Sequence, residues 1–63
     1  MSPKYEVGQV AEVNVGHRTI KGRIDWAAWD GDKHHYLIEW IDNNAEHQSR
    51  WFEEDRLTTV SPL

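Results

Sequence analysis

The chain of 63 residues has no cysteine, one methionine and two prolines, and it contains no long apolar run. Without cysteine it can form neither a disulfide framework nor a thiolate metal site, which favours an intracellular, cytoplasmic setting. The longest apolar stretches, such as Tyr36-Leu37-Ile38, are too short to cross a bilayer, and the first residues lack a signal-peptide pattern. These absences predict a soluble protein of one small domain.

Basic residues are also scarce, with seven against eleven acidic ones and a net charge of −4. The overall field therefore repels polyanions. The alternative to this reading is a nucleic-acid-binding barrel, which would use a local set of basic side chains: Arg18, Lys21, Arg23 and Arg50. Because charge runs usually form a solvated strand face, solubility is the main role expected for this set.

The chain is rich in tryptophan for its length, with four residues: Trp26, Trp29, Trp40 and Trp51. A chain of this size buries only about 60% of its unfolded surface, so it cannot enclose four indole rings. At least one tryptophan is expected on the surface, where a large apolar group marks a contact site.

Alternating apolar and polar residues predict an all-β domain over residues 5–60, with tails at 1–4 and 61–63. A first strand carries Ala11, Val13 and Val15. Later strands are expected at 19–26, 34–41, 47–52 and 57–60, with a single tight turn at 53–56. Five short strands without an amphipathic helix predict a small antiparallel barrel.

Strand alternation also predicts which side chains are buried. The expected core is Val13, Val15, Ile20, Ile24, Ile38, Trp40 and Leu57, closed by Tyr36, Trp26 and one of Trp51 or Phe52. Gly22 is expected at a bend or a close backbone approach. Leu37 and Ile41 fall on the opposite face of their strand, which is therefore a candidate contact with a partner or a second subunit. Residues 27–33 are expected to form a loop that carries Trp29, and the asparagines of 42–44 a left-handed turn.

The glycines and apolar positions resemble those of SH3-like small barrels, including Tudor-like and related bacterial and phage domains. The residues that carry the resemblance are Val7-Gly8, Val13, Gly22-Arg23-Ile24, Tyr36-Leu37-Ile38-Glu39-Trp40 and Trp51-Phe52-Glu53-Glu54-Asp55-Arg56-Leu57. The resemblance implies a five-stranded barrel with a one-turn 3₁₀ helix before the last strand, from a bacterium, phage or other mobile element. It informs fold more than function.

A narrower resemblance is to the plasmid-borne type II dihydrofolate reductases, small SH3-like subunits that form a tetramer around one active pore. That family uses a Val-Gln-Ile-Tyr stretch and a lysine after its first strand. The corresponding segments here read Gln48-Ser49-Arg50-Trp51 and Asn14-Val15-Gly16. Since neither catalytic element is present, reductase activity is the outlying hypothesis.

The main functional hypothesis is a non-enzymatic adaptor that contacts a protein partner through an acidic, tryptophan-containing loop. The expected contact residues are Trp29, Trp26, Asp30, Asp32 and Trp51, because tryptophan with a polar rim is typical of interface hot spots. An alternative is an aromatic cage for a methylated ammonium group, built from Trp26, Trp29, Tyr36 and Trp51. Homo-oligomerisation is a further alternative, since it lets a small domain bury more surface.

Catalytic and metal chemistry are not expected. His34 and His35 are adjacent in a strand and point to opposite faces, so they cannot readily share one ion. His17 and His47 are expected in turns. The carboxylates of Glu53-Glu54-Asp55 beside Arg56 are interpreted as exposed charge or an ion pair of the 3₁₀ turn. The sequence therefore predicts no cofactor and no enzyme activity.

Overall fold

The computed structural model describes residues 2–62, so the parts of the expected tails at Met1 and Leu63 lie outside the described residues. Its elements, in chain order, are β1 (Val10–Asn14), β2 (Thr19–Trp29), β3 (His34–Ile41), β4 (His47–Glu53), the 3₁₀ turn η1 (Glu54–Arg56) and β5 (Leu57–Val60). The predicted all-β class and the 3₁₀ turn before the last strand are confirmed. The third and fifth strands have the predicted bounds.

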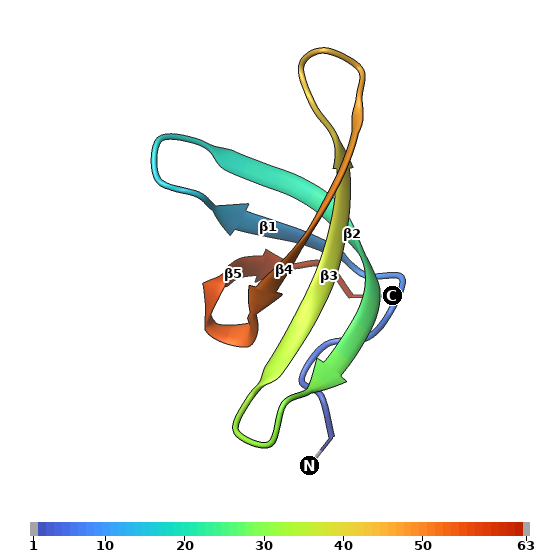
Figure 1. Ribbon diagram of the computed structural model, residues 1–63, viewed down its shortest axis with the longest axis vertical. Helices are drawn as coiled ribbons and strands as arrows, with labels where there is room; N and C mark the ends of the chain where they lie inside the picture. Colours follow the sequence, from blue (N-terminus) through green and yellow to red (C-terminus); the bar gives the residue numbers. More distant parts are fainter. Residues whose placement is uncertain (1, 63) are drawn as a thin grey trace.

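The five strands form one antiparallel sheet in the order β4-β3-β2-β1-β5. The long strand β2 curves across the molecule, running beside β1 at its start and beside β3 at its end (Figure 1). Strands β4 and β5 are the two edges, and the sheet is not closed into a barrel by pairing between them. The architecture is therefore a curved, open five-stranded sheet compatible with a small barrel fold.

The core lies inside the curve of this sheet, where every strand contributes at least one buried side chain. Its members are Ala11, Val13, Ile24, Tyr36, Ile38, Phe52 and Leu57. Of the residues expected there, Val15 and Trp40 are only partly buried and pack against the cluster. Of Trp51 and Phe52, the two alternatives for closing the core, Phe52 is buried and Trp51 is exposed.

Gly22 allows the close approach that its position in the pattern predicts. A Cβ atom at this residue would lie 2.2 Å from the backbone oxygen of Glu39 and 2.8 Å from Cγ2 of Ile38. No side chain fits at these distances, so strand β3 crosses β2 closely only because residue 22 is glycine. This crossing helps the sheet to curve over its own core.

A β-bulge in β2 overturns the expected burial of Trp26. Ile24 pairs with Ile38 and Trp26 pairs with Leu37, so Asp25 is an extra residue without a partner in β3. The extra residue reverses the alternation, and Trp26 lies on the outer face of the sheet with 61% of its surface exposed. Trp26 is therefore not a core residue.

The same strand is longer than predicted, because β2 continues to Trp29 and the connection to β3 is confined to a tight turn. Asp30 closes this turn by accepting hydrogen bonds from the backbone N–H groups of Asp32 and Lys33, each at 2.8 Å. Trp29 is thus the last residue of a strand rather than part of a loop.

The β3–β4 turn also differs from the prediction in one detail. Asp42 accepts hydrogen bonds from the backbone N–H groups of Asn44 and Glu46, at 2.9 and 3.0 Å. The left-handed residue, however, is Ala45, with φ of 62°, and not one of the two asparagines. Alanine carries a Cβ that makes this conformation unfavourable, so the turn stores some strain.

Candidate functional site

Two exposed tryptophans lie in one cross-strand row on the outer face of the β2–β3–β4 part of the sheet. Trp26 of β2 is opposite Leu37 of β3, and Leu37 is opposite Trp51 of β4. Trp26 is 61% exposed and Trp51 is 47% exposed. Directly opposed residues of an antiparallel pair have Cβ atoms about 5 Å apart, so the three side chains form a continuous apolar surface. We call this surface the tryptophan row.

Ion pairs flank the tryptophan row on both sides. On one side the Arg23 guanidinium contacts Asp25 at 3.1 Å and Glu39 at 2.7 Å. On the other side Lys33 Nζ lies 2.9 Å from Glu53 Oε2. Each of the three flanking carboxylates thus contacts a cation, although Asp25 and Glu39 share Arg23.

These contacts favour the charged forms of Arg23, Lys33 and Glu53. The hydrogen bond to Asp25, with the nearby charge of Glu39, raises the pKa of Arg23. The hydrogen bond between Lys33 and Glu53 raises the pKa of the ammonium and lowers the pKa of the carboxyl. All of these side chains are solvated, so they form a polar rim that stays charged at neutral pH and contributes little to folding.

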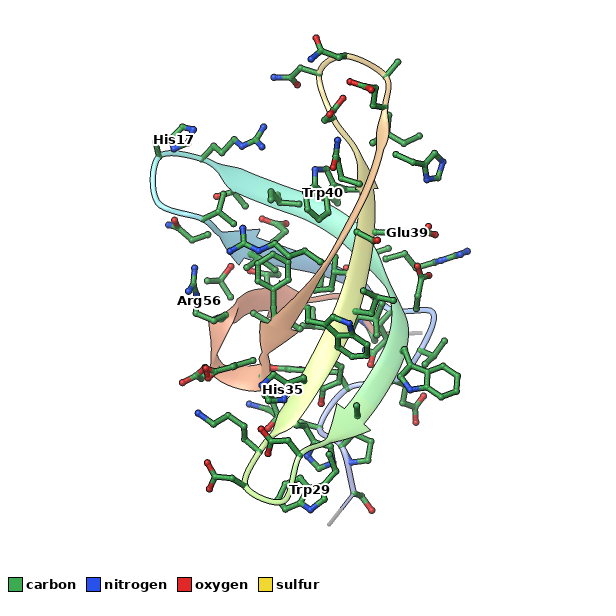
Figure 2. All side chains as sticks on the ribbon, viewed as in Figure 1. His17, Trp29, His35, Glu39, Trp40 and Arg56 are labelled. Atoms are coloured by element: carbon green, nitrogen blue, oxygen red, sulfur yellow. The ribbon has the colours of Figure 1, made fainter. Side chains whose placement is uncertain are left out.

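Trp29 does not belong to the tryptophan row, although it was expected in the same contact site. It is opposite His34 and its ring packs against that imidazole, with centroids 4.8 Å apart and planes tilted by 52°. His34 is buried, and Ala27, two residues before Trp29, is opposite the buried Tyr36. Trp29 therefore lies on the face that contains the core, beside the β2–β3 turn at one end of the molecule (Figure 2).

The acidic residues predicted to accompany Trp29 lie in the β2–β3 turn, which Asp30 stabilises. Backbone hydrogen bonds from Lys33 and Asp32, in that order of effect, lower the pKa of Asp30. Its second carboxylate oxygen lies 3.5 Å from Nδ1 of His35. Asp32 is exposed in the same turn. Among the expected contact residues, the structure brings Trp26 and Trp51 together and leaves Trp29, Asp30 and Asp32 at the end of the β2–β3 hairpin.

The residues proposed for an aromatic cage do not meet. Tyr36 is fully buried, with its hydroxyl donating to Glu54 Oε2 at 2.5 Å and accepting from the Tyr5 backbone N–H at 3.2 Å. Trp29 lies on the opposite face from Trp26 and Trp51. The arrangement offers an exposed apolar row on the outer face of the sheet in place of a cage.

The basic residues of the nucleic-acid alternative are dispersed as well. Arg23 is engaged by two carboxylates, and Lys21 is opposite Glu12 in the β1–β2 pair. Arg50 is opposite Ile38, so it lies on the other face of the sheet, with its guanidinium 5.2 Å from the Phe52 ring centroid. Arg18 is in the β1–β2 turn. These side chains form no continuous positive surface.

A shallow pocket of about 260 Å³ adjoins one end of the outer face. Its lining residues are Arg23, Glu39, Trp40, Ile41 and His47. Glu39 and Trp40 project from opposite sides of β3 (Figure 2), and the Trp40 ring is tilted against Phe52 with centroids 6.5 Å apart. The pocket adds an apolar contact at Ile41, which is exposed, beside the matched charges of Arg23 and Glu39.

The carboxylates around the 3₁₀ turn have structural partners. Glu53 pairs with Lys33, and Glu54 accepts from Tyr36 and from the Lys4 backbone N–H. Arg56 donates to the backbone oxygen of Asn14 at 2.9 Å, where an ion pair with its acidic neighbours was expected. Across residues 2–62 no group of three histidine or acidic side chains is arranged to hold a metal ion.

Within the same described residues, no helix has the length and apolar character needed to cross a membrane. A comparison of the chain with protein-family models, curated proteins and solved structures finds no match.

Leu37 is the member of the row that was not grouped with the tryptophans, although its strand face was a candidate contact. The available signal was its position in β3, where Leu37 and Ile41 alternate with the core residues Tyr36 and Ile38. A strand that is apolar on both faces either lies between two layers or contacts a partner. No second layer covers Leu37 among the described residues, and it sits between two tryptophans.

Proposed function

We propose that this chain is a non-enzymatic binding module of the SH3-like small-barrel type, and that its tryptophan row contacts a protein partner. The single observation that carries the proposal is the pairing of Trp26 and Trp51 across Leu37 on one exposed face. Exposed apolar side chains scattered singly are ordinary, but two tryptophans on either side of one leucine are a concentrated contact surface.

The composition of this surface favours a protein over a charged ligand. Tryptophan supplies a large rigid contact area, and it is enriched among the residues that carry most of the binding energy in protein interfaces. The ion pairs of Arg23 and Lys33 supply a polar rim in which every carboxylate already contacts a cation. Such a rim excludes water around an apolar centre without attracting a highly charged partner.

The shape of the surface favours an extended segment of the partner. The row crosses three strands on the outer side of the curved sheet (Figure 1). The pocket at the end of the outer face holds only about 260 Å³, which is below the usual range of about 300–1,000 Å³ for small-molecule sites. Side chains that project from an extended backbone match such a row better than a compact small molecule does.

Selection from a random-peptide display library on the immobilised protein tests the proposal. We expect enriched peptides that carry apolar side chains and bind the parent at least about 30-fold more tightly than a Trp26→Ala/Trp51→Ala variant, since hot-spot truncation costs about 2 kcal/mol or more. Circular dichroism verifies that the variant is folded.

Trp29→Ala is the matched control, because it removes an indole of similar exposure from the opposite face. Peptides selected on the parent should bind this variant as tightly as the parent. Selected peptides that bind the double variant equally well, or that lose binding only with Trp29→Ala, contradict the proposal.

A further inference from the structure

Strand β4 is a long and regular sheet edge, whose formally charged residues are Arg50 and Glu53. All seven of its residues pair with β3 in an unbroken register, and the segment contains no proline, glycine or lysine. The other edge differs: β5 has four residues, its pairing with β1 is interrupted by a bulge between Glu12 and Val13, and Pro62 follows closely. Long regular edges readily add another strand, whereas short or bulged ones resist it.

The direction of the backbone groups in β4 follows from the neighbouring turn. The backbone N–H of Asp42 donates to the oxygen of Glu46 at 2.9 Å, which makes these two residues a hydrogen-bonded pair. Hydrogen-bonded and non-hydrogen-bonded pairs alternate along an antiparallel ladder. With the observed register, the backbone groups that point toward β3 are those of Gln48, Arg50 and Phe52. The backbone groups that point away from β3 are those of His47, Ser49, Trp51 and Glu53.

The outward backbone groups belong to the same residues whose side chains lie on the outer face of the sheet. A strand added to this edge therefore continues the row beyond Trp51. None of the outward groups has a backbone partner within residues 2–62. Any occupant of this edge must satisfy the N–H and C=O groups of Ser49 and Trp51 and cover the free side of the Trp51 ring.

We propose that a second copy of this chain occupies the edge, pairing antiparallel with β4 about a two-fold axis at Trp51. The two Trp51 residues then face each other, Ser49 faces Glu53 of the second copy, and Arg50 faces Phe52 of the second copy. The two five-stranded sheets become one continuous sheet. Its outer face carries an uninterrupted apolar row that runs through both copies of Trp26, Leu37 and Trp51.

The side chains of β4 suit this self-pairing. Arg50 lies over the Phe52 ring of its own chain, at 5.2 Å from the centroid, and in the proposed register it faces an uncharged residue, the buried Phe52 of the second copy. Ser49 gains an acidic acceptor in Glu53. Moving the axis to Arg50 would instead place two guanidinium groups directly opposite, which is unfavourable.

The charge distribution also permits two copies to approach along this edge. The chain carries −4, but the carboxylates within β4 and directly opposite it, Glu53 and Glu39, are paired with Lys33 and Arg23. Self-association of like-charged chains is opposed least where each contributes a locally neutral surface. The inference goes beyond the proposed function, because it concerns the strand edge and leaves the face free to bind a partner.

Sedimentation equilibrium of the full chain measures the association directly. We expect the apparent mass to rise with concentration toward twice 7.4 kDa. Ser49→Pro should lower the association constant at least about tenfold, since the N–H it removes points away from β3 and the intramolecular ladder is kept. Ser49→Ala, which retains the N–H, should associate as the parent does. A parent that stays at 7.4 kDa up to about 1 mM, the weak end of specific association, overturns the proposal.

Disulfide trapping tests the register without relying on the proline variant. The chain has no native cysteine, so Ser49→Cys and Glu53→Cys introduce the only thiols. In the proposed register residues 49 and 53 of different copies are a hydrogen-bonded pair about 5.5 Å apart at Cα, within disulfide range. Mixing the two variants under oxidising conditions should give a mixed covalent dimer. Failure of the mixture to cross-link, or equal cross-linking by Ser49→Cys alone, overturns the register.

These outcomes are separate from those of the peptide selection. A monomeric chain that still binds peptides through Trp26 and Trp51 would refute the dimer and retain the binding surface. It would also assign the β4 edge to an extended segment of a different protein. A dimer that selects no peptide would refute the proposed function and retain the edge pairing.

Discussion

Ile24 and Trp26 are two positions apart in β2, yet Ile24 is fully buried and Trp26 is 61% exposed on the opposite face of the sheet. Regular alternation would place both side chains on the same face. The bulge at Asp25 separates them and directs the larger, more apolar side chain toward solvent. Bulges often redirect a side chain near a functional site, and this one places Trp26 beside Leu37 and Trp51.

The bulge predicts that truncating Ile24 lowers the free energy of unfolding more than truncating the larger Trp26 does. Ile24→Ala should lower the free energy of unfolding by about 2 to 5 kcal/mol, because it opens a cavity in the core. Trp26→Thr removes more atoms but should cost no more than about 1 kcal/mol, since most of the ring is solvated and threonine suits a strand. Urea unfolding of both variants provides the comparison. An equal or greater loss for Trp26→Thr would show that the ring is a core element.

The close crossing of β2 and β3 predicts that Gly22 tolerates no side chain. Gly22→Ala would place a Cβ 2.2 Å from the Glu39 backbone oxygen, which can be relieved only by separating the two strands. Such overpacking typically costs about 1 to 3 kcal/mol. Lys21→Ala, at the exposed neighbouring position, is the control and should change the free energy of unfolding by about 0.5 kcal/mol or less. Thermal melts of the two variants that coincide would contradict the crossing.

The hydrogen bond between Tyr36 and Glu54 predicts a stability change at alkaline pH. Burial first, and then the bond to Glu54, raises the pKa of Tyr36 from 10.0 to about 12. The folded state therefore binds this proton more tightly than the unfolded state does. Its contribution to stability is complete below pH 10 and disappears as the pH rises through about 12.

The same bond lowers the pKa of Glu54 below its usual 4.5, although desolvation opposes the effect. Here the folded state binds the proton less tightly, so the contribution is present above pH 4.5 and is lost as the pH falls through the lowered pKa. Tyr36→Phe should cost about 1 to 3 kcal/mol at neutral pH and flatten both slopes. Tyr5→Phe, which leaves the Tyr36–Glu54 bond in place, should keep them. Parallel pH profiles of urea midpoints for parent and Tyr36→Phe would disprove this linkage.

The β3–β4 turn predicts an unusual stabilising substitution. Ala45 adopts φ of 62°, a conformation that costs an L-residue with a Cβ roughly 1 to 2 kcal/mol and costs glycine little. Ala45→Gly should therefore raise the free energy of unfolding by about 1 kcal/mol. Asn44→Gly, at a neighbouring position with negative φ, should give no gain. A lower melting temperature for Ala45→Gly than for the parent would exclude strain at this residue.

The sequence predicted the strands well because the relevant signals are local. The alternation of Tyr36, Ile38 and Trp40 and the glycine at position 22 gave the third strand and the close crossing, since both depend on periodicity and the absence of a Cβ. The turn at Asp30-Gly31-Asp32 was visible for the same reason. Closure of the sheet was expected from the five short strands and from the resemblance, and the observed sheet remains open between β4 and β5.

The composition of the site could be predicted less well than its strands. Trp26 and Trp51 were expected to contact a partner, but their grouping with Trp29 assumed a loop at 27–33 that is instead strand. The bulge at Asp25 has no clear mark in the sequence, because its cause is the register between β2 and β3, a relationship between distant residues. The registers of β2 and β4 with β3 placed Leu37 between the tryptophans. The left-handed position of Ala45, in place of an asparagine, belongs to the separate turn between β3 and β4.

The indole N–H resonances of the four tryptophans test the binding surface most directly. In a two-dimensional ¹⁵N spectrum, titration with a peptide selected on the protein should shift or broaden the signals of Trp26 and Trp51. The signals of Trp29, on the other face, and of Trp40, packed against Phe52, should stay in place. Single Trp→Phe variants assign the four signals. A saturating peptide that leaves Trp26 and Trp51 unmoved, or that perturbs Trp29 instead, would contradict a partner site on the tryptophan row.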